Sequence, residues 1–267
     1  MAYAIALANQ KGGVGKTTGT VELSTILCEL GKKVLAIDLD QQCNLTKNSK
    51  LPEGVKIGDT IYELFTDDAI KVQDVIKTTE AGYDLLPGSP KMSKADKDFS
   101  DTPDTYLLSD LLDSLSEEYD YFLIDNAPAR NTLLNMSYLA ADYFIMCADS
   151  GEDSLDGIDS IATDMMKFHK AGKRALSNAK ILGVIITRYR KTNISDAIIE
   201  ITEENMAENI PEVIKTEEKP FVMTVRETSK VDEAKMMHQP LQKYKRSATA
   251  AIDYREIADE IIRRVEG

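Results

Sequence analysis

Asn9-Gln10-Lys11-Gly12-Gly13-Val14-Gly15-Lys16-Thr17-Thr18 is the stretch of sequence that decides the fold. The apolar run Ala2 to Ala8 precedes it and is typical of a strand, and apolar residues from Val21 to Leu27 follow it at helical spacing. Glycines between a strand and a helix let backbone N–H groups turn toward phosphate oxygens, and the helix N-terminus adds the positive end of its dipole. The stretch therefore predicts a phosphate-binding loop, and its context disfavours the alternative of a glycine-rich turn that binds nothing.

The loop carries two lysines where a phosphate-binding loop needs one. It departs from the ordinary G-x-x-x-x-G-K-[ST] pattern because residue 10 is Gln, and it matches the deviant form K-G-G-x-G-K-[ST]-T. We expect Lys16 to reach the β- and γ-phosphates of ATP and the Thr17 hydroxyl to bind Mg²⁺. The other nucleotide contacts are predicted at Lys11, Gly12, Gly13, Val14, Gly15 and Thr18.

Apolar strand patterns alternate with helical patterns along the chain. Further strands are predicted at Lys33–Asp38, Tyr83–Leu86, Tyr121–Asp125, Tyr143–Ala148 and Ile181–Thr187. Helices are predicted at Thr60–Phe65, Tyr106–Leu115, Asn193–Glu208 and Ser247–Val265. Continuous apolar strands separated by helices predict an α/β fold, namely a mostly parallel, twisted sheet with helices on both faces.

The length and the absence of a linker favour one P-loop NTPase domain over residues 1–267. Ser89–Thr105, which is rich in Ser, Lys, Asp and Pro, is expected to be a long mobile loop.

Carboxylates follow two of the predicted strands. Asp125 ends the apolar run Tyr121–Asp125, and in a P-loop protein such a residue holds Mg²⁺ and its water shell. Asp38 and Asp40 are expected to face the same crevice, because alternate residues of a strand point to one side. One of the two would support the metal shell and the other would orient or deprotonate the attacking water. The alternative is that both merely cap a loop.

Lys11 lies on the outer edge of the loop, where its side chain would point away from its own nucleotide. A cation placed between the β- and γ-phosphates accelerates phosphoryl transfer by roughly 10³–10⁵. Lys11 would do this best across a two-fold interface, on the ATP of a partner. We therefore expect a homodimer that ATP holds together and that hydrolysis releases.

These segments together resemble the ParA/Soj branch of the ParA–MinD family of deviant Walker ATPases over nearly the whole chain. Ala36-Ile37-Asp38-Leu39-Asp40-Gln41-Gln42-Cys43-Asn44 is similar to the family's D-L-D-P-Q-G-N segment, and Tyr119–Asp125 to its Walker B strand. Leu182–Thr187 resembles the strand before its nucleotide-base region, and Asp232-Glu233-Ala234 its S-E-A element. Gln41, Cys43 and Asn126–Ala129 depart from the family pattern beside catalytic strands.

The resemblance implies roles for particular residues. Lys11 would be the signature lysine that acts across the dimer, Lys16 the phosphate lysine and Thr17 a Mg²⁺ ligand. Asp40 would activate water, and Asp125 would be the Walker B residue.

Members of this branch bind DNA non-specifically as ATP dimers. The candidate contacts here form two clusters, Lys243, Lys245 and Arg246, and Arg188 and Arg190 with Lys191. The net charge of −13 counts against a general affinity for nucleic acid, so any contact would be local. A basic surface that only contacts water is the alternative.

The resemblance implies an ATPase that partitions a plasmid, mobile element or chromosome by cycling on and off the nucleoid in the cytoplasm, with a centromere-binding adaptor protein that stimulates hydrolysis.

Two other functions compete with partition. A MinD-like switch at a membrane surface would need a basic amphipathic C-terminal helix, and Glu256–Gly267 is acidic. An iron–sulfur carrier like the nitrogenase iron protein would need two suitable cysteines beyond the Walker B strand, and the chain offers Cys147 alone. No secretory signal, membrane span, disulfide framework or structural zinc site is expected.

Overall fold

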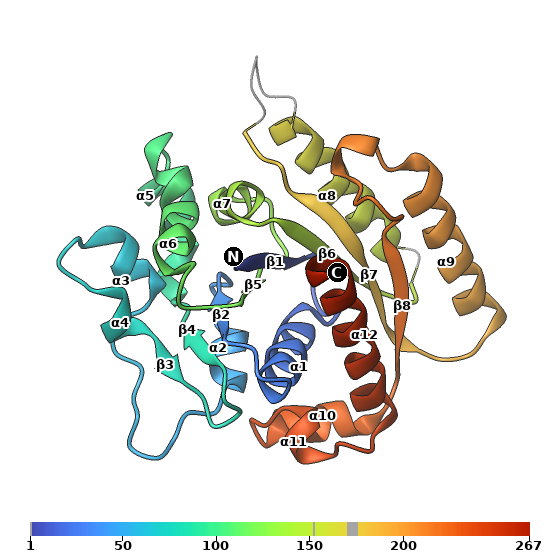
Figure 1. Ribbon diagram of the computed structural model, residues 1–267, viewed down its shortest axis with the longest axis horizontal. Helices are drawn as coiled ribbons and strands as arrows, with labels where there is room; N and C mark the ends of the chain where they lie inside the picture. The colour runs from blue at the N-terminus through green and yellow to red at the C-terminus, as the bar shows by residue number, and fades with distance from the viewer. Residues whose placement is uncertain (1, 152, 170–175) are drawn as a thin grey trace.

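The computed structural model describes residues 2–151, 153–169 and 176–267. Its eight strands form one sheet in the order β3-β4-β2-β5-β1-β6-β7-β8 (Figure 1). The strands are β1 (Tyr3–Ala8), β2 (Val34–Asp38), β3 (Lys77–Thr78), β4 (Asp84–Leu86), β5 (Tyr121–Asp125), β6 (Tyr143–Asp149), β7 (Lys180–Tyr189) and β8 (Phe221–Arg226). Every pairing is parallel except that between β3 and β4. The predicted mostly parallel sheet is confirmed.

Helices cover both faces of this sheet (Figure 1). On one face lie α6 (Leu107–Leu115), α7 (Thr132–Ala140), α8 (Asp153–His169) and α9 (Asn193–Glu204), and on the other lie α1 (Lys16–Glu29), α10 (Ser229–Met236), α11 (Leu241–Tyr244) and α12 (Thr249–Glu266). The remaining helices are short: α2 (Asn44–Asn48), α3 (Ile61–Thr66), α4 (Val72–Val75) and α5 (Ala95–Asp98).

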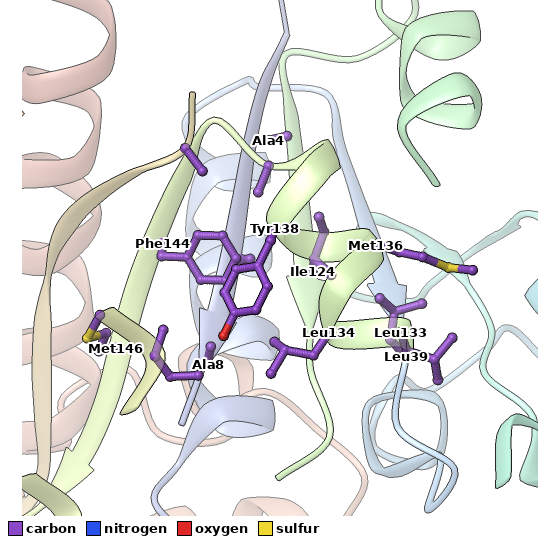
Figure 2. Close-up of a cluster of buried hydrophobic side chains, with 14 of the residues drawn as sticks. Ala4, Ala8, Leu39, Ile124, Leu133, Leu134, Met136, Tyr138, Phe144 and Met146 are labelled. Atoms are coloured by element: carbon purple, nitrogen blue, oxygen red, sulfur yellow. The ribbon is translucent and has the colours of Figure 1, made fainter. Parts of the chain in front are cut away.

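The alternation of side chains along the strands divides the interior into two cores. In β1, Ala4, Ala6 and Ala8 belong to the core under α6–α9, whereas Ile5 and Leu7 belong to the core under α1 and α12. This is the period of two that a strand buried on both faces requires. The first core includes a packed group of α7 and strand side chains (Figure 2), in which the ring centroids of Tyr138 and Phe144 are 5.2 Å apart.

The sheet register brings the sequence-predicted carboxylates together. Asp38 of β2 lies opposite Asp125 of β5, at the carboxyl ends of neighbouring parallel strands. Each lies two residues after an apolar residue of its strand, Ala36 or Leu123, that faces the core covered by α1. Residues two apart on a strand point to the same face. The two carboxylates therefore lie on the face of the sheet where α1 and its glycine-rich loop begin.

Two sequence predictions need correction, and one strand was not predicted. Ser89–Thr105, predicted as a long mobile loop, contains the short helices Pro90–Lys94, α5 and the start of Pro103–Tyr106, and Met92, Ala95 and Phe99 are buried. The helix predicted at Asn193–Glu208 ends as an α-helix at Glu204 and continues as a π-helical turn, Asn205–Asn209. Strand β8 was not predicted, because it is a half-buried edge strand whose continuous apolar run, Phe221-Val222-Met223, is short.

None of the helices in the described part of the chain is both long enough and apolar enough to cross a lipid bilayer.

Candidate nucleotide site

The glycine-rich loop connects β1 to α1 at the carboxyl edge of the sheet. Gly13 and Gly15 have φ angles of 77° and 92°, which is the left-handed region that glycine adopts without strain. Gly15 is the N-cap of α1, and a Cβ atom there would lie 2.8 Å from Thr187 Cγ2. The loop therefore needs glycine at residue 15 for both its backbone angle and its close packing. Its geometry leads directly into a 14-residue helix, as an anion site at a helix N-terminus requires.

Lys16 extends back over the loop that precedes it. Its Nζ donates to the backbone oxygens of Asn9 and Lys11, both at 3.1 Å, and the residue is buried. Burial lowers the pKa of Lys16, while the charges of Cys147, Asp125 and Asp40 act in the opposite direction. An ammonium group held inside the loop in this way is positioned to neutralise a phosphate bound there.

Lys11 is directed toward the end of β6. Its Nζ lies 3.3 Å from Asp149 Oδ1, and its backbone N–H donates to Asn9 Oδ1 at 2.8 Å. About a third of the Lys11 side chain is exposed. The two loop lysines thus have different partners, since Lys16 pairs with backbone oxygens of the loop and Lys11 with Asp149 of β6. That Lys11 points away from its own nucleotide and acts across a dimer stays a prediction.

Thr17 and Asp125 meet at the start of α1. Thr17 Oγ1 donates to Asp125 Oδ2 at 2.7 Å. Within the described residues, Asp125 Oδ1 is buried and has no hydrogen-bond partner. Burial, together with the charge of Asp38, raises the pKa of Asp125 well above its usual range. A hydroxyl beside a buried carboxylate with an unused oxygen fits the hard oxygen ligands that Mg²⁺ prefers. No group of three His, Cys, Asp or Glu residues suited to a metal occurs in the described ranges.

Asp38 has a different environment from the one expected of a metal ligand. Its Oδ2 accepts hydrogen bonds from Thr46 N at 2.8 Å and Thr46 Oγ1 at 2.6 Å, and its Oδ1 accepts one from Asp40 N at 3.1 Å. Both oxygens are therefore already paired with donors of the chain, and Asp38 holds the loop that carries Asp40. Its predicted role at the metal stays untested.

Asp40 lies in that loop, largely buried, and its Oδ1 accepts a hydrogen bond from Gln42 N at 2.8 Å. The loop turns at Cys43, whose φ of 52° and ψ of 40° are left-handed, in the place of the family's glycine. The departure noted in the sequence is thus a backbone position at which a side chain is strained.

A cavity of about 410 Å³ adjoins the glycine-rich loop. The loop residues Gly13, Gly15 and Thr18 form one wall, and the other walls come from the end of β7, from β8 and α10 and from Tyr254 of α12. Their lining residues are Thr187, Arg188, Arg190, Val225, Arg226, Glu227, Thr228, Ser229, Val231, Asp232, Lys235 and Tyr254. The volume suits a small-molecule ligand. Sequence reasoning missed β8 as a wall of this site. It did find the neighbouring segment Asp232-Glu233-Ala234 of α10, through its resemblance to a family element.

The two predicted DNA clusters have different surroundings. Arg188 and Arg190 line the cavity, and Arg190 forms an ion pair with Glu227. Lys243 and Arg246 are exposed and pair with Glu29, and Lys245 is also exposed. The exposed cluster of Lys243, Lys245 and Arg246 is compatible with an outer DNA-binding surface. Arg188 and Arg190, in contrast, belong to the wall of the candidate nucleotide site. DNA contact stays a prediction for both clusters.

The loop, the inward lysine and the paired Thr17 and Asp125 at the carboxyl edge of a parallel sheet define a P-loop nucleotide-binding protein. Comparison with known proteins narrows this class. The AAA domain family matches residues 2–181. Chromosome partitioning protein ParA of Caulobacter vibrioides is 27% identical over 97% of this chain and 94% of its own length. Sporulation initiation inhibitor protein Soj of Bacillus subtilis is 26% identical over 98% of each chain.

Among solved structures, the septum site-determining protein MinD of Pyrococcus horikoshii, complexed with Mg-ADP, aligns with a TM-score of 0.74. It is 24% identical, and the alignment covers 98% of this chain and 96% of MinD. The chain belongs to the AAA domain family, and its predicted resemblance to ParA and Soj is confirmed, as is the prediction of an ATP hydrolase.

Proposed function

We propose that this chain is a Mg²⁺-dependent ATPase that dimerises around ATP, binds DNA non-specifically and partitions a plasmid, mobile element or chromosome. It would act as one domain over residues 1–267, at the nucleoid, with a centromere-binding adaptor that stimulates hydrolysis. The observation that carries this proposal is that the two loop lysines have different partners, Lys16 the backbone oxygens of the loop and Lys11 the carboxylate of Asp149. The name of the Caulobacter vibrioides relative, chromosome partitioning protein ParA, which matches 97% of this chain, supports the partition part.

Each site residue has a task in this proposal. The backbone N–H groups from Gly12 to Thr18 and the Lys16 ammonium would bind the triphosphate, and the 410 Å³ cavity would receive the nucleoside. Thr17 and Asp125 would hold Mg²⁺, which neutralises charge on the phosphates when it is bound.

Asp40 would orient the attacking water and accept its proton. Its backbone N–H donates to buried Asp38 and its Oδ1 accepts from Gln42 N, so its position is fixed from two sides.

Lys11 would act on the nucleotide of the second protomer. In the single chain its ammonium lies beside Asp149, so formation of the dimer would exchange a carboxylate neighbour for a triphosphate. The higher charge of the triphosphate favours this exchange.

The membrane alternative finds no support in α12. Its apolar face, with Ile257, Ile261 and Val265, is buried in the core beneath the sheet, so it is not available for a lipid surface. Arg263 and Arg264 of the same helix pair with Glu218 and Glu260.

DNA retardation with ATP, with ADP and without nucleotide, each at two salt concentrations, tests the proposal. We expect binding that requires ATP and weakens steeply with salt, because contacts to phosphates release counterions. Binding that is equal in all three nucleotide states would refute it.

Sedimentation of the Asp40→Ala variant tests the dimer separately. This variant should bind ATP and remain dimeric, because the group that activates water is lost and the phosphate contacts are kept. A purely monomeric variant in saturating ATP would contradict the proposed ATP-held dimer.

A further inference from the structure

Glu29, the last residue of α1, forms ion pairs with two cations of the proposed DNA-binding surface. Its Oε1 lies 2.8 Å from Lys243 Nζ, and its Oε2 lies 3.0 Å from Arg246 Nη1. The Glu29 side chain is 17% exposed, whereas those of Lys243 and Arg246 are 43% and 63% exposed. The carboxylate therefore joins the two cations from their inner side, and their outer sides face solvent.

The position of Glu29 in the helix is unfavourable by itself. The C-terminus of a helix carries the negative end of the dipole, which favours cations there, and α1 has no basic residue in its last turn. Lys243 and Arg246, which lie more than 200 residues further along the chain, supply the compensating charge. The two ion pairs thus offset a local electrostatic conflict at the end of α1.

The basic segment, residues 241–246, is held against α1 by further hydrogen bonds. Glu22, about two turns earlier in α1, accepts hydrogen bonds from the backbone N–H groups of Leu241 at 2.6 Å and Gln242 at 3.2 Å. Arg255 of α12 donates to Gln242 Oε1 at 2.6 Å and to the Arg246 backbone oxygen at 3.1 Å. Because the backbone is fixed from two helices, only the outer side chains can exchange one anionic partner for another.

We propose that Glu29 sets the DNA affinity of this surface, because its carboxylate pairs with Lys243 and Arg246 and competes with a backbone phosphate for their charge. This inference rests on the proposed DNA-binding function. Lys245, which is exposed, makes the first contact with the duplex, and a phosphate then competes with Glu29 for the two paired cations. Glu29 thereby weakens binding at a surface that would otherwise present three cations.

The Glu29→Gln variant tests this inference, because it keeps the size and one oxygen of the side chain and removes the charge. We expect ATP-dependent binding to random duplex to tighten about two- to tenfold at low salt. The slope of log affinity against log salt should become steeper by about 0.9 for each cation released. In the Lys243→Ala/Arg246→Ala background, Glu29→Gln should produce no gain.

Glu218→Gln is the matched control. Glu218 also joins two cations, Arg263 at 2.6 Å and Arg264 at 3.7 Å, and its substitution changes the net charge by the same amount. Arg263 lies 14 residues into α12, roughly 20 Å from the start of that helix beside Arg246. This variant should bind DNA as the wild-type protein does.

The outcomes separate the two levels of the proposal. If the wild-type protein binds DNA and Glu29→Gln has the same affinity, or if Glu218→Gln gains as much affinity as Glu29→Gln, the role of Glu29 is overturned. DNA binding itself would then stand. Binding by Glu29→Gln alone would support the role of Glu29. Absence of ATP-dependent binding in all three proteins would overturn both the DNA-binding function and this inference. Thermal melting of each variant verifies that it is folded.

Discussion

Glu22 is a buried carboxylate whose charge should make the stability of the protein depend on pH. Burial, opposed by hydrogen bonds from Leu241 and Gln242 and assisted by the charge of Glu29, raises the pKa of Glu22 to about 7 from its ordinary value of 4.5. The difference of about 2.5 pKa units corresponds to about 3 kcal/mol. Since the folded pKa is the higher one, this stability is fully present below about pH 4.5 and is lost as the pH rises through 7.

The perturbation is Glu22→Gln, which cannot ionise. Urea unfolding of both proteins in the absence of nucleotide should be measured from about pH 4.5 to pH 8. The wild-type free energy of unfolding should fall by about 3 kcal/mol more than that of the variant over this range. Asp38 and Asp125, whose pKa values burial also raises, are present in both proteins and cancel in the comparison.

A residue-specific measurement distinguishes Glu22 from other groups. The backbone amide protons of Leu241 and Gln242 donate to its carboxylate, so their NMR shifts should titrate together with a midpoint near the pKa of about 7. Parallel stability curves for wild type and Glu22→Gln, within about 0.5 kcal/mol at every pH, would refute the reasoning. So would amide shifts that titrate near 4.5.

Three further substitutions test the loop and its supports. Lys16→Ala should abolish ATP binding in a calorimetric titration, because the ammonium held over the loop is lost; unchanged affinity would exclude Lys16 as the phosphate lysine. Gly157 of α8 packs against Asn9, whose Oδ1 accepts a hydrogen bond from the Lys11 backbone N–H of the loop. Gly157→Ala should lower the free energy of unfolding by about 1–3 kcal/mol and weaken ATP binding, because its Cβ would lie 2.0 Å from Asn9 Oδ1; a wild-type urea midpoint would contradict this packing. Cys43→Gly should be more stable than Cys43→Ala by about 1 kcal/mol in urea, since glycine alone relieves the left-handed φ; the reverse order would show that the position is not strained.

The strands and the phosphate loop could be predicted because their signals are local. β1, β2 and β5 are continuous apolar runs, and Lys16 and Thr17 sit at fixed offsets from the glycines. Residues 89–105 also contain apolar residues at helical spacing, but the polar composition of the segment led to the prediction of a loop. Met92, Ala95 and Phe99 stand at helical spacing and are buried, although polar residues surround them.

The contacts of α1 with the basic segment could not be predicted, because they join residues more than 200 positions apart. From the sequence, Glu22 and Glu29 cannot be distinguished from the solvent-exposed glutamates of an ordinary helix. Their partners are brought close only by the packing of α11 against α1. The position of Arg188 and Arg190 in the cavity wall could not be predicted for a similar reason, since the opposite wall comes from β8, whose apolar run is short.

α1 has the nucleotide site at one end and Glu29 at the other. Lys16 and Thr17 begin this 14-residue helix, and Glu29 ends it about 20 Å away. A packed helix of this length moves as a rigid body, so a displacement of the loop on ATP binding would shift Glu29 against Lys243 and Arg246. If the shift weakens these ion pairs, Glu29→Gln should strengthen DNA binding more without nucleotide than with ATP. The ratio of the two affinities would then shrink severalfold, which titrations of labelled duplex can measure. If dimerisation alone controls DNA binding, Glu29→Gln will tighten both states equally and leave the ratio unchanged, and a role of α1 in coupling the two ends is then excluded.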